Sequence, residues 1–574
     1  MRIGFSLVSA LAITLAACSP SAEEAAIEPA IDAADVVYWG GAIYTANDEQ
    51  PQVTAVATQD GRITFAGDEA DAELLIGPET RIVDLNGGAM YPGFTDSHVH
   101  VFGVGQRERT LNLDSVASIE DLVARVAETV EGAEPGQVVY GRGWIETHYP
   151  EARFPNRDDL DAVSPDNPVV LIRADGHALV ANSAALEAGG ITRDSAAPEG
   201  GEILFDEAGE PTGMLIDTAM YPVTALVAAP TGQERADIYA EGAARLASLG
   251  WAGGHDMSVP YSDVEMIEGV AEAGHLAIRV YVSVNPDGYA ALSQEVPRIA
   301  ADGRVITRAV KIYMDGALGS RGAALLSPYS DRPETSGLTI AEEDQTIGLF
   351  TEALRSGVQM NVHAIGDRGN RLLLDWVEEA LAHVPEEERA RIDHRWRDEH
   401  TQIVEPSDMP RFAELGVIAS MQPSHAIGDL HFAPARLGEE RLEGAYAWQT
   451  LLDNGARLTG GSDAPVEQGD PRIEFYATVA RADLEGFQGE NWHPEEALSR
   501  DDALKLFTLW PAYASFREDE LGSIEVGKRA DFTIFSDDIM TIEPMEILSV
   551  TPWMTVVGGE AVYEHEASFH RSGE

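Results

Sequence analysis

Two histidines, His98 and His100, stand one residue apart at the end of the apolar run Tyr91–Ser97. The run is typical of a buried strand, and successive side chains of a strand point to opposite faces. The two imidazoles therefore project to the same side, where they supply half of a zinc site and leave room for further ligands. Such a pair can equally be an ordinary surface or hydrogen-bonded pair, so the interpretation depends on what later segments add.

Lys311 occurs in a later segment of alternating character, Val310–Asp315. Alternation places Lys311 and Asp315 on one face of the strand, and in a barrel that face can point inward. An inward lysine is costly unless it is paired or modified. Two interpretations stay open: a salt bridge to Asp315, or carbamylation by CO2, which would turn the ammonium into an anionic carbamate able to bridge two metal ions.

Three further segments end in a potential metal ligand, namely His363, His400 and Asp463. Each has a simpler interpretation: a hydrogen-bonded histidine at a strand end for the first two, and a helix N-cap for Asp463. Taken together, the sequence offers four imidazoles, one potential carbamate and one carboxylate, all at predicted strand ends. That coincidence favours a site for two metal ions over six unrelated structural roles.

The elements that must position these residues alternate along the chain as strand and helix. Such alternation predicts an α/β fold with a (β/α)8 TIM-like barrel, whose active site gathers at the C-terminal strand ends. The gap after the first strand is too long for one crossover, so residues of about 111–226 are predicted to form a large insertion. The predicted strands are Tyr91–Ser97, Trp251–Asp256, Ala277–Val284, Arg308–Asp315, Val358–His363, Trp396–Thr401, Val417–Met421 and Arg457–Asp463.

Short strands separated by glycine turns occupy both ends of the chain. This sequence pattern predicts a small composite β-sandwich domain built from residues 34–88 and 515–574, with the barrel over residues 89–514. The balance of 39 basic against 97 acidic residues gives a formal charge of -58. Such a surface repels phosphate backbones, so nucleic acid is excluded as a partner.

The first residues are typical of a bacterial lipoprotein signal peptide, residues 1–17, because a short apolar run ends in Leu15-Ala16-Ala17-Cys18 and resembles a lipobox. Cys18 would then be lipidated and followed by a tether over residues 18–33. The expected location is the cell envelope, on the periplasmic face of the outer membrane. Since Cys18 is the single cysteine, disulfides within the chain and thiolate metal sites are excluded. Expected partners are a small amide-like substrate and the membrane, with a homodimer as a further candidate.

The chain resembles the amidohydrolase superfamily, specifically its amidohydrolase family 3 (YtcJ-like) branch, from about residue 34 to residue 562. One departure is Asp398, which stands where the family usually has an apolar residue; this makes His394 an alternative ligand in that segment. The motifs that carry the resemblance are Pro92-Gly93-Phe94-x-Asp96-x-His98-x-His100, Lys311-x-x-x-Asp315-Gly316, His363-Ala364-Ile365-Gly366-Asp367-Arg368, Glu399-His400-x-Gln402 and Gly461-Ser462-Asp463-x-Pro465.

The resemblance implies two divalent metal ions, zinc by default, with manganese, iron or cobalt as alternatives. It makes His98, His100 and Asp463 ligands of the more buried ion and assigns His363 and His400 to the second. A carbamate on Lys311 would bridge them. A metal-bridged hydroxide would then hydrolyse an amide-like C–N bond, in an N-acyl, N-formyl, carbamate or cyclic amide group. Asp463 would be the catalytic residue that moves the proton to the leaving nitrogen.

Four more residues are weaker candidates for contact with the substrate: Trp144, His177, Arg321 and His425. Trp144 could instead be buried in the insertion's own core, and His177 could be structural. His425 could reach the pocket after the seventh strand and stabilise an oxyanion.

Two other functions compete with the binuclear hydrolase. One is a mononuclear metal deaminase or cyclic-amide hydrolase in which Lys311 is unmodified. The other is a catalytically degenerate barrel retained as an envelope scaffold lipoprotein, against which the intact ligand set argues.

Overall fold

The computed structural model describes residues 33–566 apart from residues 115, 147, 148, 175, 177, 199 and 490. The predicted signal peptide and Cys18 lie outside the described residues, as do His177 and all of the predicted tether except its last residue. Within the described ranges, no helix is both long enough and apolar enough to cross a membrane.

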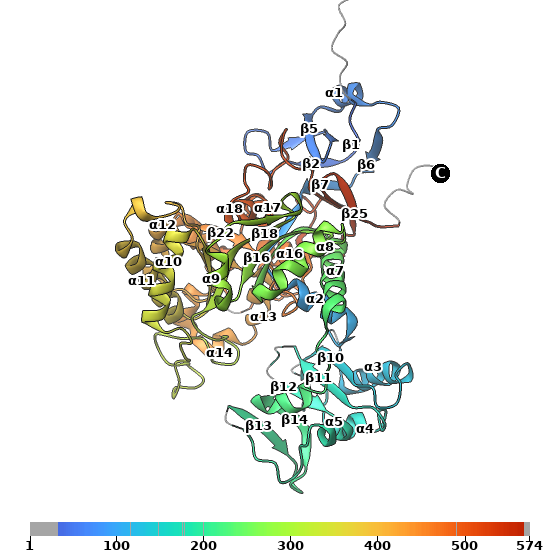
Figure 1. Ribbon diagram of the computed structural model, residues 1–574, viewed down its shortest axis with the longest axis vertical. Helices are drawn as coiled ribbons and strands as arrows, with labels where there is room; N and C mark the ends of the chain where they lie inside the picture. Colours follow the sequence, from blue (N-terminus) through green and yellow to red (C-terminus); the bar gives the residue numbers. More distant parts are fainter. Residues whose placement is uncertain are drawn as a thin grey trace, which may run out of the picture.

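A nearly closed parallel barrel occupies the centre of the molecule (Figure 1). Its strands are β8 (Phe94–Val99), β15 (Trp251–Val259), β16 (Arg279–Val284), β18 (Val305–Tyr313), β19 (Gln359–Ala364), β20 (Arg397–His400), β21 (Ile418–Met421) and β22 (Arg457–Gly460). Each of these strands lies beside the next one along the chain. The last and first strands meet where the Asp463 N–H donates to the His98 carbonyl at 2.6 Å. The prediction of an α/β barrel is therefore confirmed.

Helices cover the outer face of the barrel because their apolar residues repeat with helical spacing. α11 (Asp367–His383), for example, buries Leu373, Leu374 and Val377. The strands are covered on both faces, and β16 is accordingly buried along its whole length. The other helices of this layer are α8 (Val264–Glu272), α9 (Tyr289–Leu292), α10 (Glu343–Ser356), α12 (Met409–Leu415), α13 (Pro423–Asp429), α14 (Ala433–Leu437), α15 (Trp448–Asp453), α16 (Pro471–Ala480), α17 (Arg500–Leu506) and α18 (Leu509–Ala514).

A β-sandwich above the barrel in Figure 1 combines both ends of the chain. Its strands are β1 (Val36–Trp39), β2 (Ala42–Tyr44), β3 (Gln52–Val53), β4 (Ala55–Gln59), β5 (Arg62–Gly67), β6 (Arg81–Asp84), β7 (Ala89–Pro92), β23 (Phe532–Phe535), β24 (Pro552–Val557) and β25 (Glu560–Glu564). One sheet has the order β5-β4-β1-β6, and the other has the order β25-β24-β23-β7-β2-β3. The two ends share one apolar core, in which Tyr38 and Ile43 lie in the same cluster as Phe532 and Ile534.

The first barrel strand begins later than the sequence pattern suggests. The predicted strand Tyr91–Ser97 divides at Gly93, because β7 belongs to the sandwich and β8 to the barrel. The Gly93 N–H donates to the Asp531 carbonyl at 2.8 Å. A Cβ at Gly93 would lie 2.7 Å from the Cβ of Ala252, so the crossing has no room for a side chain. Both flanking strands are buried, so the apolar run conceals the change of sheet.

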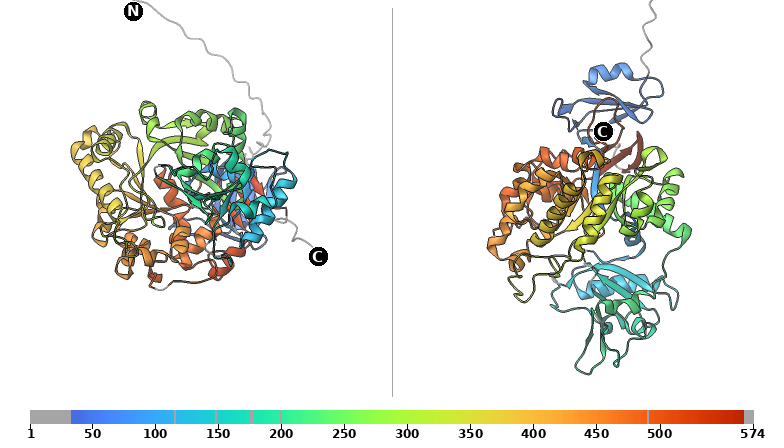
Figure 2. Two further views of the ribbon diagram at one scale, coloured as in Figure 1. Left: turned by 90° about the horizontal axis from the view of Figure 1, so that it is seen from below. Right: turned by 60° about the vertical axis from the view of Figure 1, so that its left-hand side comes forward.

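The insertion forms a separate lobe below the barrel in Figure 1 and in the right-hand view of Figure 2. Its strands and helices are β9 (Leu111–Asn112), α3 (Ile119–Glu131), β10 (Val139–Trp144), α4 (Arg157–Asp161), β11 (Val169–Arg173), β12 (Ala178–Ala181), α5 (Ser183–Ala188), β13 (Gly201–Phe205), β14 (Pro211–Asp217) and α6 (Tyr221–Thr224). The strands make one sheet in the order β13-β14-β12-β11-β10-β9, with apolar clusters of its own.

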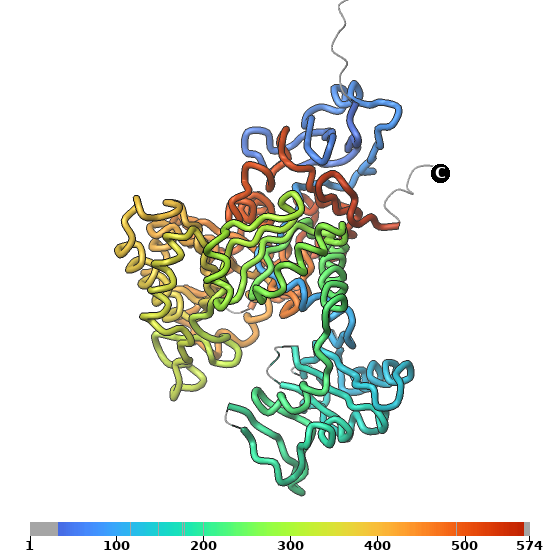
Figure 3. The backbone as a smooth tube through the Cα atoms, in the orientation of Figure 1, coloured from blue at the N-terminus to red at the C-terminus, as the bar shows by residue number. Residues whose placement is uncertain are grey.

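The chain enters the insertion through α2 (Val101–Arg109) and returns through α7 (Gly232–Leu249), and the two helices pack against each other (Figure 3). Their backbones touch because two glycines face each other. A Cβ at Gly105 would lie 1.9 Å from the Ile238 carbonyl oxygen, and one at Gly242 would lie 2.2 Å from that of Val101. The entry and exit of the insertion are therefore fixed side by side.

Candidate metal centre

His98 and His100 face the same point, as the strand period predicts. His98 lies within β8, and His100 is the N-cap residue of α2. Their Nε2 atoms lie 3.7 Å and 3.1 Å from one oxygen, Asp463 Oδ1. The Nδ1 atom of His100 lies 3.0 Å from the carbonyl oxygen of Met257, which can accept its proton and leave Nε2 free as a ligand.

Asp463 approaches the two histidines from the end of the last barrel strand. Its φ of 61° lies in the left-handed region, so the chain turns sharply there and directs the carboxylate inward. Burial alone would raise the pKa of Asp463, but His98, His100 and His400 hold it well below its usual range. Asp463 does not cap the following helix, α16, because Asp470 does so.

A buried carboxylate, Glu399, fixes the ring of His98. Glu399 Oε2 lies 2.7 Å from His98 Nδ1, so the proton sits on Nδ1 and the Nε2 lone pair faces the centre. Arg397 holds this carboxylate in turn, with its Nε 2.7 Å from Glu399 Oε1. Both side chains are fully buried. Their role was missed by the sequence analysis, although strand alternation on β20 places both on the inward face.

His400 and His363 complete the cluster of imidazoles. His400 has a φ of 84°, which lets it face the centre directly after the inward-facing Glu399. Its Nδ1 lies 2.7 Å from Gln422 Oε1, a second acceptor that leaves Nε2 free. The His400 ring lies 4.8 Å from that of His98 and 4.5 Å from that of His363, centroid to centroid. Burial lowers the pKa of His98 to about 4 and that of His363 to about 3, so these two rings stay neutral, whereas Asp463 raises the pKa of His100 despite its burial.

Lys311 points into the same cluster from β18. Its Nζ lies 3.3 Å from His98 Nε2, and the side chain is buried. Asp315, the partner in the salt-bridge interpretation, instead accepts backbone N–H groups of Ala324, Ile365 and Gly366 at 2.8, 2.9 and 2.8 Å. Burial lowers the pKa of Lys311 to about 8, although Glu399 and Asp463 oppose the shift.

The donor set fits a metal. One ligand atom each from His98, His400 and Asp463 lie within 4.8 Å of one another. In the described part of the chain, His363 Nε2 is buried without a hydrogen-bond partner, which is costly unless the atom serves as a ligand. Imidazoles whose Nδ1 protons are held by acceptors, beside one charged carboxylate, are the donors that zinc and similar ions prefer.

His425 stands beside this cluster. Its ring stacks on that of His400 with centroids 5.9 Å apart. Gln402 Nε2 lies 3.2 Å from its Nδ1, and since the amide donates, the His425 proton sits on Nε2. That Nε2 lies 3.8 Å from Asp463 Oδ2 and 3.7 Å from Glu467 Oε1.

Two of the weaker candidates are engaged with other partners. Trp144 is fully buried in the insertion's own core, and its Nε1–H donates to the Leu171 carbonyl at 2.9 Å, so its role there is structural. Arg321 forms a paired contact with Asp331, with Nε and Nη2 at 3.1 and 2.7 Å from the two carboxylate oxygens. The prediction for His177 falls on a residue outside the described ones.

The unusual Asp398 leaves the register of its strand intact. It pairs with Val362 and Ala419 in the ladder, and His400 reaches the centre. The alternative ligand His394 does not, because its Nε2 lies 2.9 Å from the Leu415 carbonyl oxygen. Burial raises the pKa of Asp398 well above its usual range, and among the described residues neither carboxyl oxygen has a hydrogen-bond partner.

Comparison with known proteins agrees with this geometry. The chain is 34% identical to the YtcJ protein of Bacillus subtilis (strain 168) over 539 residues, which cover 92% of this chain and 99% of that one. It is 28% identical to the N-substituted formamide deformylase of Arthrobacter pascens over 534 residues, 90% of this chain and 95% of the relative.

Among solved structures, an uncharacterized metal-dependent hydrolase from Pyrococcus horikoshii OT3 superposes with a TM-score of 0.71 at 28% identity. The superposition covers 89% of this chain and 99% of the other. The model of the amidohydrolase family known as Amidohydro_3 matches residues 81–563. A cluster of candidate metal ligands at the C-terminal end of the barrel, and a family match that spans barrel and insertion alike, lead to one conclusion: the chain belongs to the amidohydrolase family.

Proposed function

We propose that this protein hydrolyses an amide-like C–N bond of a small molecule, in an N-acyl, N-formyl, carbamate or cyclic amide group. The observation that carries the proposal is the convergence of four imidazoles, a charged carboxylate and a buried lysine on one point. Family membership supports hydrolysis as the reaction class.

His98, His100 and Asp463 would hold one divalent metal ion, and His363 and His400 would hold a second. Zinc is the default choice, and manganese, iron or cobalt accept the same ligands. Such ions supply Lewis acidity, which makes water acidic near neutral pH and polarises a carbonyl group.

Lys311 would supply a ligand to both ions as a carbamate. With a pKa of about 8, part of its amine is uncharged near neutral pH, and only the uncharged amine adds to CO2. In that reaction a bond forms between Nζ and the carbon of CO2, and one proton leaves Nζ for solvent. The product is an anionic carbamate, which removes the repulsion between an ammonium and the cations.

The remaining steps fall to side chains of the chain itself. Asp463 would accept a proton from the attacking water and return it to the leaving nitrogen. His425 carries a proton on Nε2 and faces Asp463, so it would donate to the oxygen that becomes negatively charged during attack. Glu399 and Gln422 would keep the rings of His98 and His400 in the orientation that ligation needs.

The resemblance to an N-substituted formamide deformylase makes N-formyl amines the first substrates to test. N-acyl amino acids, carbamates and cyclic imides follow from the same chemistry. The chain covers nearly all of that relative, but the identity of 28% leaves the substrate pocket free to differ.

One observation favours a second function, that of a mononuclear deaminase or cyclic-amide hydrolase. The three groups that already lie within 4.8 Å of one another, His98, His400 and Asp463, suffice for a single ion. In that case Lys311 would stay unmodified.

Metal analysis combined with a substrate panel tests both functions. The protein would be purified without chelator, its metal content measured, and its turnover assayed on the four amide classes and on aminopurines. Two metals per chain with C–N hydrolysis support the proposal, whereas one metal with deamination supports the second function. A protein with neither bound metal nor turnover would instead favour the third candidate, a catalytically degenerate barrel that serves as an envelope scaffold.

A further inference from the structure

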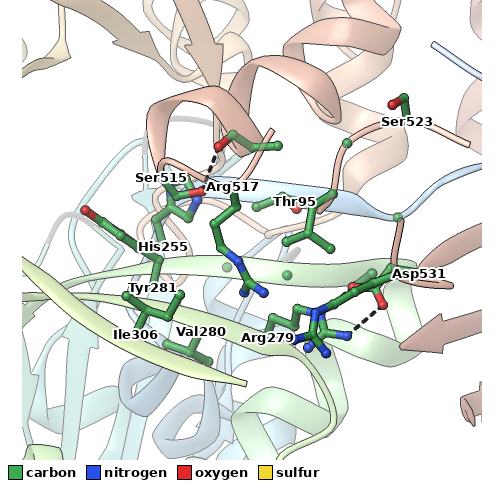
Figure 4. A pocket seen from close by; sticks show the side chains of 18 residues that line it. Thr95, His255, Arg279, Val280, Tyr281, Ile306, Ser515, Arg517, Ser523 and Asp531 are labelled. Atoms are coloured by element: carbon green, nitrogen blue, oxygen red, sulfur yellow. Dashed lines mark hydrogen bonds and ion pairs between the residues drawn. The ribbon is translucent and has the colours of Figure 1, made fainter. Parts of the chain in front are cut away.

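A second polar cavity lies at the opposite end of the barrel from the metal centre. Thr95, Gly253 and Val280, at the N-terminal ends of β8, β15 and β16, form its inner wall. The segment that follows α18, from Ser515 to Asp531, covers it (Figure 4). The cavity therefore sits where the base of the barrel meets the segment leading into the sandwich.

The charged side chains of this cavity are mostly basic. Arg279, Arg517 and Arg529 line it, and among the described lining residues the carboxylates are represented by Asp531 alone. That carboxylate is already engaged: Arg279 Nε and Nη2 lie 2.6 and 2.9 Å from its oxygens, and the Gly558 N–H donates to it at 2.7 Å. Arg529 is paired with the exposed Asp302 at 2.9 Å, so the excess of positive charge is confined to the buried end, where Arg279 and Arg517 face Asp531.

The guanidinium of Arg517 is destabilised by its burial and by the two other guanidinium groups. Burial, followed by the charge of Arg279, lowers the pKa of Arg517, and Arg529 adds to the shift. Arg517 Nη1 donates to the Gly303 carbonyl at 2.7 Å, and its Nη2 contacts Glu520, which Arg529 shares. The Glu520 side chain is 43% exposed to solvent, so it neutralises the charge of the buried Arg517 only in part. In Figure 4 the guanidinium of Arg517 points into the cavity.

His255 contributes a neutral donor to the same wall. Arg397 Nη1 lies 2.8 Å from its Nδ1, and since a guanidinium can only donate, Nδ1 accepts and the ring proton sits on Nε2. Burial and Arg397 lower the pKa of His255 well below its usual range, so the ring stays neutral. Guanidinium N–H groups and an imidazole N–H are donors that suit an anion.

The size of the cavity limits the ligand to a small one. It encloses about 30 Å³, while roughly 10–15 Å³ on this scale hold one water molecule. A phosphate ester or a dicarboxylate would not fit, whereas a halide is little larger than water. An outer groove of about 260 Å³ shares Arg279 and Arg529 with the cavity and is also lined by Asp302.

We propose that this cavity is a binding site for chloride, held between Arg517, Arg279 and the ring of His255, and that the ion stabilises the joint between barrel and sandwich. The ligating groups come from separate parts of the chain: β16 and β15 of the barrel and the segment after α18. The Arg517 and Arg279 guanidinium groups repel each other, and a chloride ion between them would attract both. The site is independent of the proposed hydrolytic function.

The direct test uses bromide as the probe. Crystals of the wild-type protein soaked in sodium bromide should show an anomalous peak inside the cavity, in contact with the Arg517 guanidinium. A cavity without such a peak, in crystals where bromide is seen elsewhere on the surface, would overturn the proposal.

A thermal test asks whether binding occurs at ordinary concentrations. The melting temperature would be followed in sodium chloride and in sodium gluconate at equal ionic strength, because gluconate is too large to enter. Above the dissociation constant, each tenfold rise in chloride should multiply the ratio of folded to unfolded protein about tenfold.

Arg517→Met should abolish this chloride dependence. Arg332→Met is the matched control, because Arg332 forms an exposed ion pair with Glu334 and should leave the chloride dependence intact. Equal responses to chloride and gluconate in the wild-type protein, or the same chloride response in Arg517→Met, would contradict the site.

Discussion

Replacing Glu399 by glutamine removes one negative charge from the support of the metal centre and keeps its shape. Glu399 accepts from His98 Nδ1 at 2.7 Å and neutralises Arg397, and all three side chains are buried. A glutamine oxygen can still accept from Nδ1, so the ring orientation survives while the charge that makes the imidazole a stronger ligand is lost. Metal affinity should therefore fall by roughly 10–100-fold.

The cost in stability follows from the pKa of Glu399. Burial alone would raise this pKa, but Arg397 and His98 lower it to about 2 from the 4.5 of an exposed glutamate. Because the folded-state pKa is the lower one, the charge stabilises the fold above pH 4.5, and this contribution is lost as the pH falls toward 2. The difference corresponds to about 3 kcal/mol. Leaving Arg397 buried and unpaired is expected to cost a similar roughly 3–5 kcal/mol.

Two measurements test the expected losses of metal affinity and of stability. A chromophoric chelator would report the metal dissociation constant, and urea unfolding of the metal-free protein at pH 7 would report stability. Glu474→Gln is the matched control, since Glu474 is equally buried but accepts from the Ser424 N–H and not from a ligand histidine. Burial raises the pKa of Glu474 well above its usual range, so a neutral glutamine should be tolerated there.

The reasoning would be refuted if Glu399→Gln kept its metal affinity within about twofold of the wild type. It would also fail if Glu474→Gln lost as much affinity, because the effect would then reflect any change in the barrel interior.

The remaining predictions concern the ligands, the modification and the anchor. Lys311→Ala should lose metal and turnover together and regain part of both when acetate is supplied with metal; two retained metals with near-normal turnover would show the binuclear carbamate mechanism to be wrong. Asp463→Asn should lose turnover by about 10²–10⁴-fold while metal analysis still finds at least one ion, and unchanged turnover would remove its assigned role in proton transfer. At a fixed concentration of dissolved CO2, reactivation of metal-free protein should slow about tenfold per pH unit below a pKa of about 8, because protonated Lys311 cannot add to CO2; a flat profile would contradict carbamylation. We propose that Cys18 carries a lipid anchor in the cell envelope, so Cys18→Ser should leave the membrane fraction or remain unprocessed, and a mature N-terminus beyond Cys18 would exclude the anchor.

The barrel and the convergence of the candidate ligands could be predicted because they depend on short-range regularities. The period of two residues in a strand is enough to place His98 beside His100, and it holds in the structure. Glycines at the end of a strand, such as Gly460-Gly461, indicate the turn that directs Asp463 inward. These signals lie within a few residues of the groups they position.

The supporting contacts could not be predicted in this way. Glu399 and His98 are 301 positions apart in the sequence, and neither residue type indicates that the two side chains pair. The run Tyr91–Ser97 does not indicate its division at Gly93, because the strands on both sides of that residue are buried and therefore equally apolar. Trp144 carries an ambiguous signal, since a large aromatic residue serves a core as readily as a pocket. Nothing in the described structure accounts for Asp398.

The glycine contact between α2 and α7 has a consequence for how the family can diversify. With Gly105 and Gly242 locking the two helices together, the insertion leaves and rejoins the barrel at a single point. Its size and loops can therefore change from one relative to another without shifting a hydrogen bond of the barrel. Selection for new substrates can therefore act on this module without moving the residues of the candidate metal centre.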